Sequence, residues 1–119
     1  MSQIAQPDDA TQLASIVEAA ARTQTPLLTT AGDSKWDWGR GLADTVHNDR
    51  SLGHSTPTQL NLSALSGIVD YEPSELVLVV GAATPLAQIE PLLTEQGQHL
   101  AFEPVHWRST ATAGGTVAV

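Results

Sequence analysis

Two loops of small residues constrain this sequence more than any other feature. Residues 26–39 (PLLTTAGDSKWDWG) predict a short apolar strand that runs into a polar, glycine-bearing loop, and residues 111–119 (ATAGGTVAV) predict a second small-residue loop that runs into an apolar strand. Small side chains let backbone N–H groups approach a phosphate closely and adopt unusual φ values. Two such loops in a chain of 119 residues favour a nucleotide cofactor. Because the chain ends within the second predicted strand, we expect part of the cofactor site to lie beyond it.

Composition excludes several classes of function. Hydrophobic residues make up 41% of the chain, which is ordinary for a globular domain. The net charge is −8, with 13 Asp and Glu against 5 Lys and Arg. Nucleic acids and anionic membranes bind through clustered Lys and Arg, so we expect neither as a direct partner. Without Cys the chain has no disulfide, catalytic thiolate or Cys-ligated metal, and no apolar run is long enough to cross a membrane.

Hydrophobic spacing and capping residues predict an α+β fold with a small mixed sheet and two main helices. Asp8 caps the first helix, and Asp9 suits the positive end of its dipole. Thr84 caps the second helix, with Pro85 at its first position and Gly97 after its end. The expected strands are residues 27–29, 59–62, 67–71, 76–80 and 99–102, followed by one that starts after Gly115. Residues 67–71 and 76–80 form a hairpin. Since residues 76–80 are continuously apolar, we expect them to be buried on both faces.

The other polar and aromatic residues do not predict a catalytic or metal site. The four His lack the spacing of metal ligands, so we predict no metal. Asp70, Glu72 and Glu75 surround a turn, where a solvated face is a better interpretation than an acid–base pair. The three Trp flank the two loops, and packing is favoured over cofactor stacking. We name no catalytic residue.

Four phrases carry a resemblance to a known family: residues 30–40 (TAGDSKWDWGR), 65–76 (LSGIVDYEPSEL), 83–90 (ATPLAQIE) and 97–115 (GQHLAFEPVHWRSTATAGG). They resemble the N-terminal part of the FAD-binding domain of the p-cresol methylhydroxylase/vanillyl-alcohol oxidase (PCMH) type, and within it the FAD-binding subunits of bacterial glycolate oxidases. The second and fourth phrases are the most specific, and the match covers nearly the whole chain. The resemblance implies FAD as cofactor. It also implies that residues 1–119 are a partial FAD-binding domain, namely the first subdomain, with the second subdomain missing.

By position, the resemblance implies a pyrophosphate loop made of Ala31, Gly32, Asp33, Ser34 and Lys35, closed by Gly39. It implies a second flavin-contacting loop made of Ala111, Thr112, Gly114 and Gly115. Asp33 departs from what such a loop needs, because an acid beside a phosphate dianion weakens binding unless the carboxylate points to water.

The resemblance further implies that the parent protein is an FAD-dependent oxidoreductase subunit. It would oxidise a 2-hydroxy acid, glycolate to glyoxylate, and pass the electrons to partner subunits. One alternative is a non-catalytic flavin-fold fragment that acts as an assembly module, and another is a different PCMH-type flavoenzyme. We expect the isolated 119 residues to be inactive, to bind FAD poorly and to expose apolar surface at residues 116–119.

The partners that the resemblance implies are a second flavin subunit and an iron–sulfur subunit of a glycolate oxidase complex. The expected location is the cytoplasm, with attachment at the periphery of the inner membrane only through those partners, since residues 1–15 lack the pattern of a secretory signal.

Overall fold

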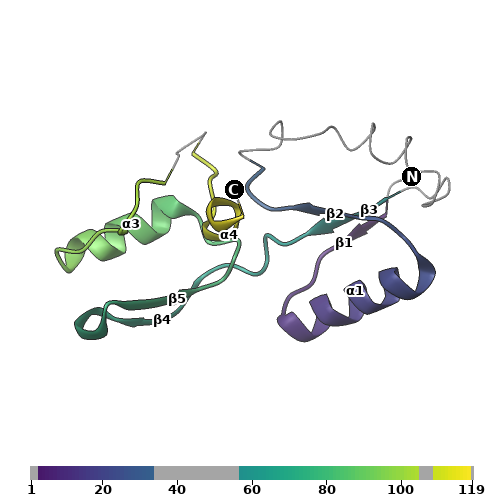
Figure 1. Ribbon diagram of the computed structural model, residues 1–119, viewed down its shortest axis with the longest axis horizontal. Coiled ribbons are helices and arrows are strands. Elements are labelled where there is room, and N and C mark those ends of the chain that lie inside the picture. Colours follow the sequence, from purple (N-terminus) through teal and green to yellow (C-terminus); the bar gives the residue numbers. More distant parts are fainter. Residues whose placement is uncertain (1–2, 34–56, 105–108, 119) are drawn as a thin grey trace. The chain divides into compact units, whose positions relative to one another are not determined.

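A computed structural model describes residues 3–33, 57–104 and 109–118, and divides them into two compact units (Figure 1). The first unit contains residues 3–30 and 57–64, and the second contains residues 31–33, 65–104 and 109–118. Both units mix helices with strands, which confirms the predicted α+β class. Within the described ranges, no helix combines the length and the apolar character that crossing a membrane requires.

The first unit is a small parallel sheet with one helix. Strands β1 (Ile4–Ala5), β2 (Leu27–Thr30) and β3 (Thr58–Asn61) pair in the order β1-β3-β2, and every pairing is parallel. Helix α1 (Ala10–Thr23) connects β1 to β2, because parallel strands need a crossover connection. Leu60 on the central strand is buried. The sequence analysis missed β1, since two residues are too few to show a strand pattern.

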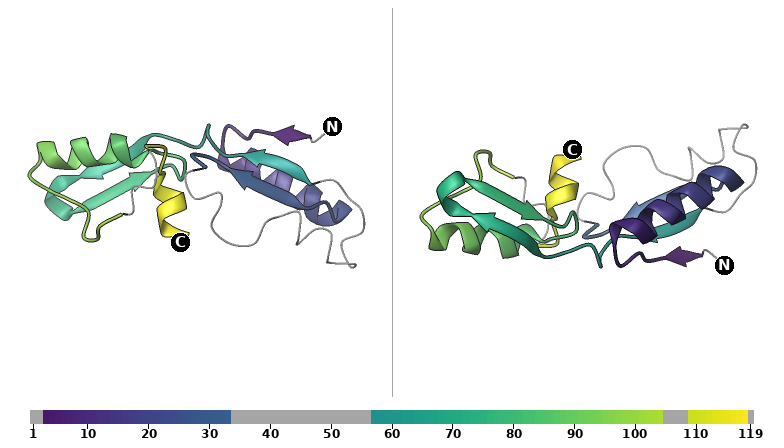
Figure 2. Two further views of the ribbon diagram at one scale, coloured as in Figure 1. Left: turned by 90° about the horizontal axis from the view of Figure 1, so that it is seen from above. Right: turned by 90° about the horizontal axis from the view of Figure 1, so that it is seen from below.

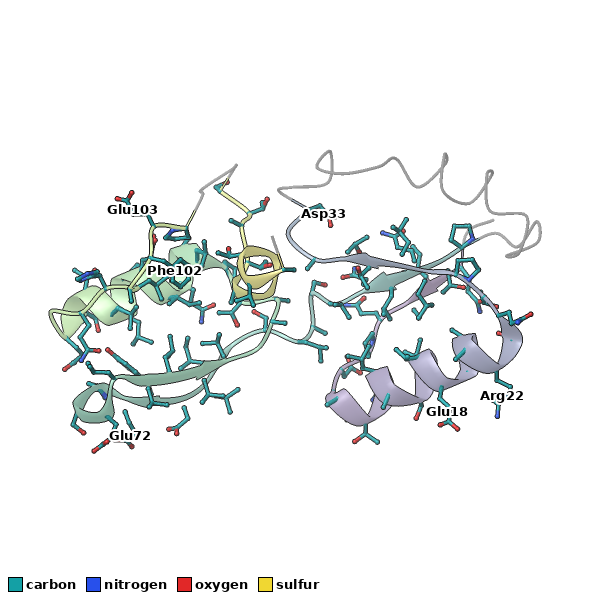
Figure 3. The ribbon with its side chains drawn as sticks, viewed as in Figure 1. Glu18, Arg22, Asp33, Glu72, Phe102 and Glu103 are labelled. Atoms are coloured by element: carbon teal, nitrogen blue, oxygen red, sulfur yellow. The ribbon has the colours of Figure 1, made fainter. Side chains whose placement is uncertain are left out.

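Helix α1 begins where the acidic residues predict. Asp9, rather than Asp8, is its N-cap, and Asp9 Oδ1 accepts a hydrogen bond from the Gln12 N–H over 2.8 Å. Leu13 and Ile16 are half-buried, whereas Glu18 and Arg22 lie on the face of α1 that points away from the strands (Figure 3).

The second unit is a β-hairpin covered on one face by a helix. Strands β4 (Ile68–Glu72) and β5 (Val77–Val80) are antiparallel and joined by the 3₁₀ turn η1 (Pro73–Glu75), and helix α3 (Leu86–Glu95) runs alongside them (Figure 2). Pro91 lies inside α3 without ending it. The core of this unit is apolar and consists of Leu86, Ile89, Leu93 and Ala111, against which Ile68, Tyr71, Leu78, Val80, Leu100 and Ala113 pack.

Burial of β5 on both faces was a wrong prediction. Leu78 and Val80 face α3, whereas Val77 and Val79 are 48% and 45% exposed. Within the described part of the chain the hairpin has two strands, and only one of its faces is covered by a helix. A continuous apolar run therefore does not distinguish a strand buried on both faces from one buried on a single face.

Two further predicted strands are absent from the described residues. Residues 99–102 form no strand. The residues after the second loop form the short helix α4 (Ala113–Val117) instead of a strand, and Val117 is 83% exposed. The expected apolar exposure at this end is therefore confirmed for Val117, although the strand that motivated it is wrong.

Thr84 has a different role from the predicted helix cap. Pro85 is the N-cap residue of α3, and the Thr84 side chain is fully buried. Thr84 Oγ1 donates to the Gly81 carbonyl oxygen over 2.6 Å and accepts from the Gly67 N–H over 2.9 Å. The hydroxyl thus joins the two ends of the hairpin, where the chain leaves β5 and where it enters β4.

We expect Thr84→Val to lower the free energy of unfolding by about 1–3 kcal/mol, because the half-buried Gly67 N–H loses its acceptor and the Gly81 carbonyl loses one of its two donors while the side-chain shape is kept. Denaturant titration of the variant and the parent chain measures this loss. Thr94→Val is the matched control, since Thr94 is exposed and its hydroxyl also donates to a carbonyl, that of Glu90 (2.8 Å). Equal losses in both variants would contradict the role assigned to Thr84.

Candidate functional site

The structure brings the described parts of the two predicted loops together within the second unit. Gly32 of the first loop lies against Thr110, which directly precedes the second loop, and against Thr112 within it. An ideal Cβ on Gly32 would overlap the carbonyl oxygen of Thr110 and would lie 3.0 Å from Thr112 Cγ2. Only glycine permits this approach of two backbones. The two loops, which the sequence places about 80 residues apart, are therefore in direct contact.

The first loop makes a tight turn at Asp33. The backbone of Asp33 is left-handed, with φ of 53°, a region that Asp and Asn tolerate better than most residues. Its Oδ1 atom accepts a hydrogen bond from the Ala31 N–H over 3.0 Å. The Ala31 N–H, which we expected to face a phosphate, is therefore taken by the side chain of the same loop. Asp33 itself is exposed (Figure 3).

Two backbone donors of the first loop remain available to a ligand. Among the described residues, the N–H groups of Gly32 and Asp33 have no hydrogen-bond acceptor. They are consecutive, and Thr110 fixes the position of the first. Consecutive N–H groups at a left-handed turn form a concave anion-binding arrangement. Ser34, Lys35 and Gly39, the other predicted members of this loop, lie outside the described residues.

The second loop starts helix α4 instead of forming an open turn. Thr112 is the N-cap, and its Oγ1 atom accepts from the Gly115 N–H over 3.2 Å. The Ala113 N–H donates to the Thr84 carbonyl oxygen over 2.9 Å, and the Gly114 N–H donates to the Ala82 carbonyl oxygen over 2.7 Å. The N–H groups of the first helical turn are therefore engaged within the protein. This loop positions the first one and adds few donors of its own.

Position 114 has room only for glycine, because its backbone packs against Ala82. An ideal Cβ there would lie 2.9 Å from both the Cβ and the carbonyl oxygen of Ala82. Ala111 is buried in the core, and its carbonyl oxygen accepts from the Leu86 N–H over 2.9 Å. Among the predicted residues of the second loop, Ala111 and Gly114 thus have clear packing roles.

Three residues that shape the site were missed by sequence reasoning. Thr110 sets the position of Gly32, while Ala82 and Thr84 hold the start of α4. The last two lie in or next to the phrase at residues 83–90, which the resemblance singled out without assigning a role to it. Both contact the start of α4 through a backbone carbonyl, a group that every residue has and that sequence reasoning therefore cannot single out.

Residues 1–119 match the FAD-binding domain family over their whole length. The chain belongs to this family. FAD is therefore its cofactor, and the paired N–H groups of Gly32 and Asp33 fit the family's ligand, because they offer donors to a phosphate at a place where the backbone is held. Among the described residues, no cluster of three or more His, Asp or Glu is placed to hold a metal ion.

The chain is also similar to the glycolate oxidase subunit GlcE of Escherichia coli (strain K12). The two are 36% identical over 102 residues, which is 86% of this chain and 25% of that protein. The chain thus spans about a quarter of the length of the curated relative that it matches. This similarity confirms the resemblance to the FAD-binding subunits of glycolate oxidases.

We expect Gly114→Ala to lower the free energy of unfolding by about 1–3 kcal/mol, because the new methyl group overlaps Ala82 and α4 must shift. Gly115→Ala is the matched control. Its Cβ would lie 3.1 Å from Thr112 Oγ1, a tight contact with one side-chain atom that a small shift relieves, and alanine favours a helix over glycine, so we expect a much smaller loss of stability. Thermal and denaturant unfolding of both variants measure the difference. A loss that is as large in Gly115→Ala as in Gly114→Ala would contradict this account of the packing.

Proposed function

We propose that this chain is the FAD-binding part of a glycolate oxidase-type subunit, which oxidises the 2-hydroxy acid glycolate to glyoxylate. The observation that supports it most is the first loop, where Thr110 holds Gly32 and leaves two consecutive N–H groups for a phosphate. The similarity to GlcE supports the substrate class.

In this proposal the Gly32 and Asp33 N–H groups bind the pyrophosphate of FAD. The Ser34 hydroxyl and the Lys35 ammonium add a donor and a positive charge, and Gly39 closes the loop. Ala111, Thr112, Gly114 and Gly115 support the cofactor by placing Thr110 beneath the first loop. When bound, FAD supplies the two-electron redox chemistry that the oxidation of an alcohol to an aldehyde requires. We assign no catalytic base to these residues.

The proposal extends to the setting in which the protein works. Electrons from glycolate would leave through partner subunits, a second flavin subunit and an iron–sulfur subunit. GlcE is itself a subunit by name, which supports a complex. The acidic composition, with a net charge of −8, argues against direct binding to an anionic membrane. We therefore propose a cytoplasmic location, with partners supplying any attachment to the inner membrane.

We expect Lys35→Gln to weaken FAD binding about tenfold, because a charged donor to a phosphate is worth roughly 1.4 kcal/mol. Isothermal titration of the chain with FAD measures the dissociation constant. Arg22→Gln is the matched control: it removes the same charge from the exposed end of α1, in the other compact unit, and we expect no change.

These titrations can also contradict the proposal. If the unsubstituted chain does not bind FAD even at about 1 mM, these 119 residues do not form a flavin site on their own, and the assembly-module alternative becomes the better interpretation of them. If both variants weaken binding equally, the effect comes from net charge and Lys35 has no special place at the phosphate.

A further inference from the structure

The acid in the first loop is the feature that the proposed function does not explain. Asp33 lies among the residues assigned to a pyrophosphate, where a negative charge opposes the ligand. We propose that Asp33 has two separable effects: its side-chain oxygen holds the loop in shape, and its charge lowers the affinity of the loop for the phosphates of FAD. This inference rests on the proposed function, because it concerns the same loop and the same ligand.

The first effect follows from the hydrogen bond within the loop. Oδ1 of Asp33 accepts from the Ala31 N–H over 3.0 Å, across a turn in which Asp33 has φ of 53°. Gly32 lies between these two residues and is held against Thr110. The side-chain oxygen therefore closes a turn whose middle residue is already fixed. An amide oxygen would accept the same hydrogen bond, and Asn tolerates the same backbone region.

The second effect follows from where that oxygen is held. The Asp33 carboxylate is separated from the Asp33 N–H by only a few covalent bonds. Its hydrogen bond with the Ala31 N–H holds it close to the backbone of the loop. A phosphate on the N–H groups of Gly32 and Asp33 would lie within roughly 6 Å of it, the range in which like charges oppose each other. Because Asp33 is exposed, water and salt weaken the repulsion without removing it.

The described residues of the second unit provide no positive charge to offset Asp33. None of them is a Lys or Arg. The nearest basic residues in the sequence are Lys35, two positions after Asp33, and Arg108, two positions before Thr110. Within the described residues of this unit nothing neutralises the Asp33 carboxylate, so its charge acts on the ligand unopposed. The geometry requires an acceptor at residue 33, but it does not require a charge.

The test compares Asp33→Asn with the parent chain, using FAD and riboflavin as paired probes. We expect Asp33→Asn to bind FAD about three- to tenfold more tightly, since the variant keeps the acceptor and loses the opposing charge. Riboflavin has no phosphate, so its affinity should stay the same. The gain for FAD should shrink as salt is raised, because salt screens exposed charges.

Two further variants separate charge from structure. Asp70→Asn removes one exposed acid from β4 in the same unit, so it corrects for net charge and should leave FAD affinity unchanged. Asp33→Ala removes the acceptor as well as the charge. We expect its unfolding midpoint to fall by about 2–4 °C, whereas Asp33→Asn keeps the midpoint of the parent.

Each outcome decides between the proposals. Tighter FAD binding in Asp33→Asn alone, with riboflavin unchanged, supports the role of Asp33. Unchanged or weaker FAD binding in Asp33→Asn, while the parent chain binds FAD, overturns that role and leaves the proposed function standing. If neither chain binds FAD, the inference about Asp33 and the proposed function both fail for these 119 residues on their own. An equal gain in Asp70→Asn would also overturn it, because net charge would then explain the effect.

Discussion

The buried hydroxyl of Thr84 is the interaction on which the arrangement of the second unit depends. It joins the Gly67 and Gly81 ends of the hairpin, and the carbonyl of the same residue accepts the Ala113 N–H at the start of α4. The position of α4 in turn sets Thr110, against which Gly32 rests. A polar group inside an apolar core costs free energy unless it is satisfied, and here several backbone groups satisfy it. The candidate phosphate loop is therefore positioned by a chain of contacts that starts well away from it.

Local chemistry was enough to predict the elements whose pattern is strong. The predicted cap at Asp8 and the apolar spacing of residues 13–20 place the start of α1 one residue from the observed cap, Asp9, and Gly97 follows α3 as predicted. Prediction failed where tertiary contacts decide. Thr84 next to Pro85 has the pattern of a helix cap, yet its hydroxyl turns inward because the ends of the hairpin need a buried partner. The apolar run at β5 likewise says nothing of how many of its faces are covered.

The candidate site shows the same division. Its residues could be grouped by their resemblance to a family, and the contact of Gly32 with Thr110 shows why both loops contain small residues. The hydrogen bonding could not be read from the sequence, since it depends on carbonyl oxygens of Thr84 and Ala82 that any residue provides. Donors that were expected to face a phosphate turn out to be used by the protein itself. The two loops look equivalent in the sequence. In the structure the first loop offers donors to a ligand, whereas the second loop mainly holds the first in place.

This division changes how substitutions in the site are interpreted. Gly32 and Gly114 are the obvious positions at which to add bulk, but a Cβ at either one meets protein before it meets any ligand. If a variant at one of these glycines fails to bind FAD, the cause can be a displaced backbone or a lost phosphate contact, and the binding measurement does not separate the two. Asp33 can be replaced by Asn without such a collision, because Asn tolerates the left-handed backbone at this position and the side chain is exposed. Charge at residue 33 is therefore a cleaner probe of the phosphate position than any change in glycine.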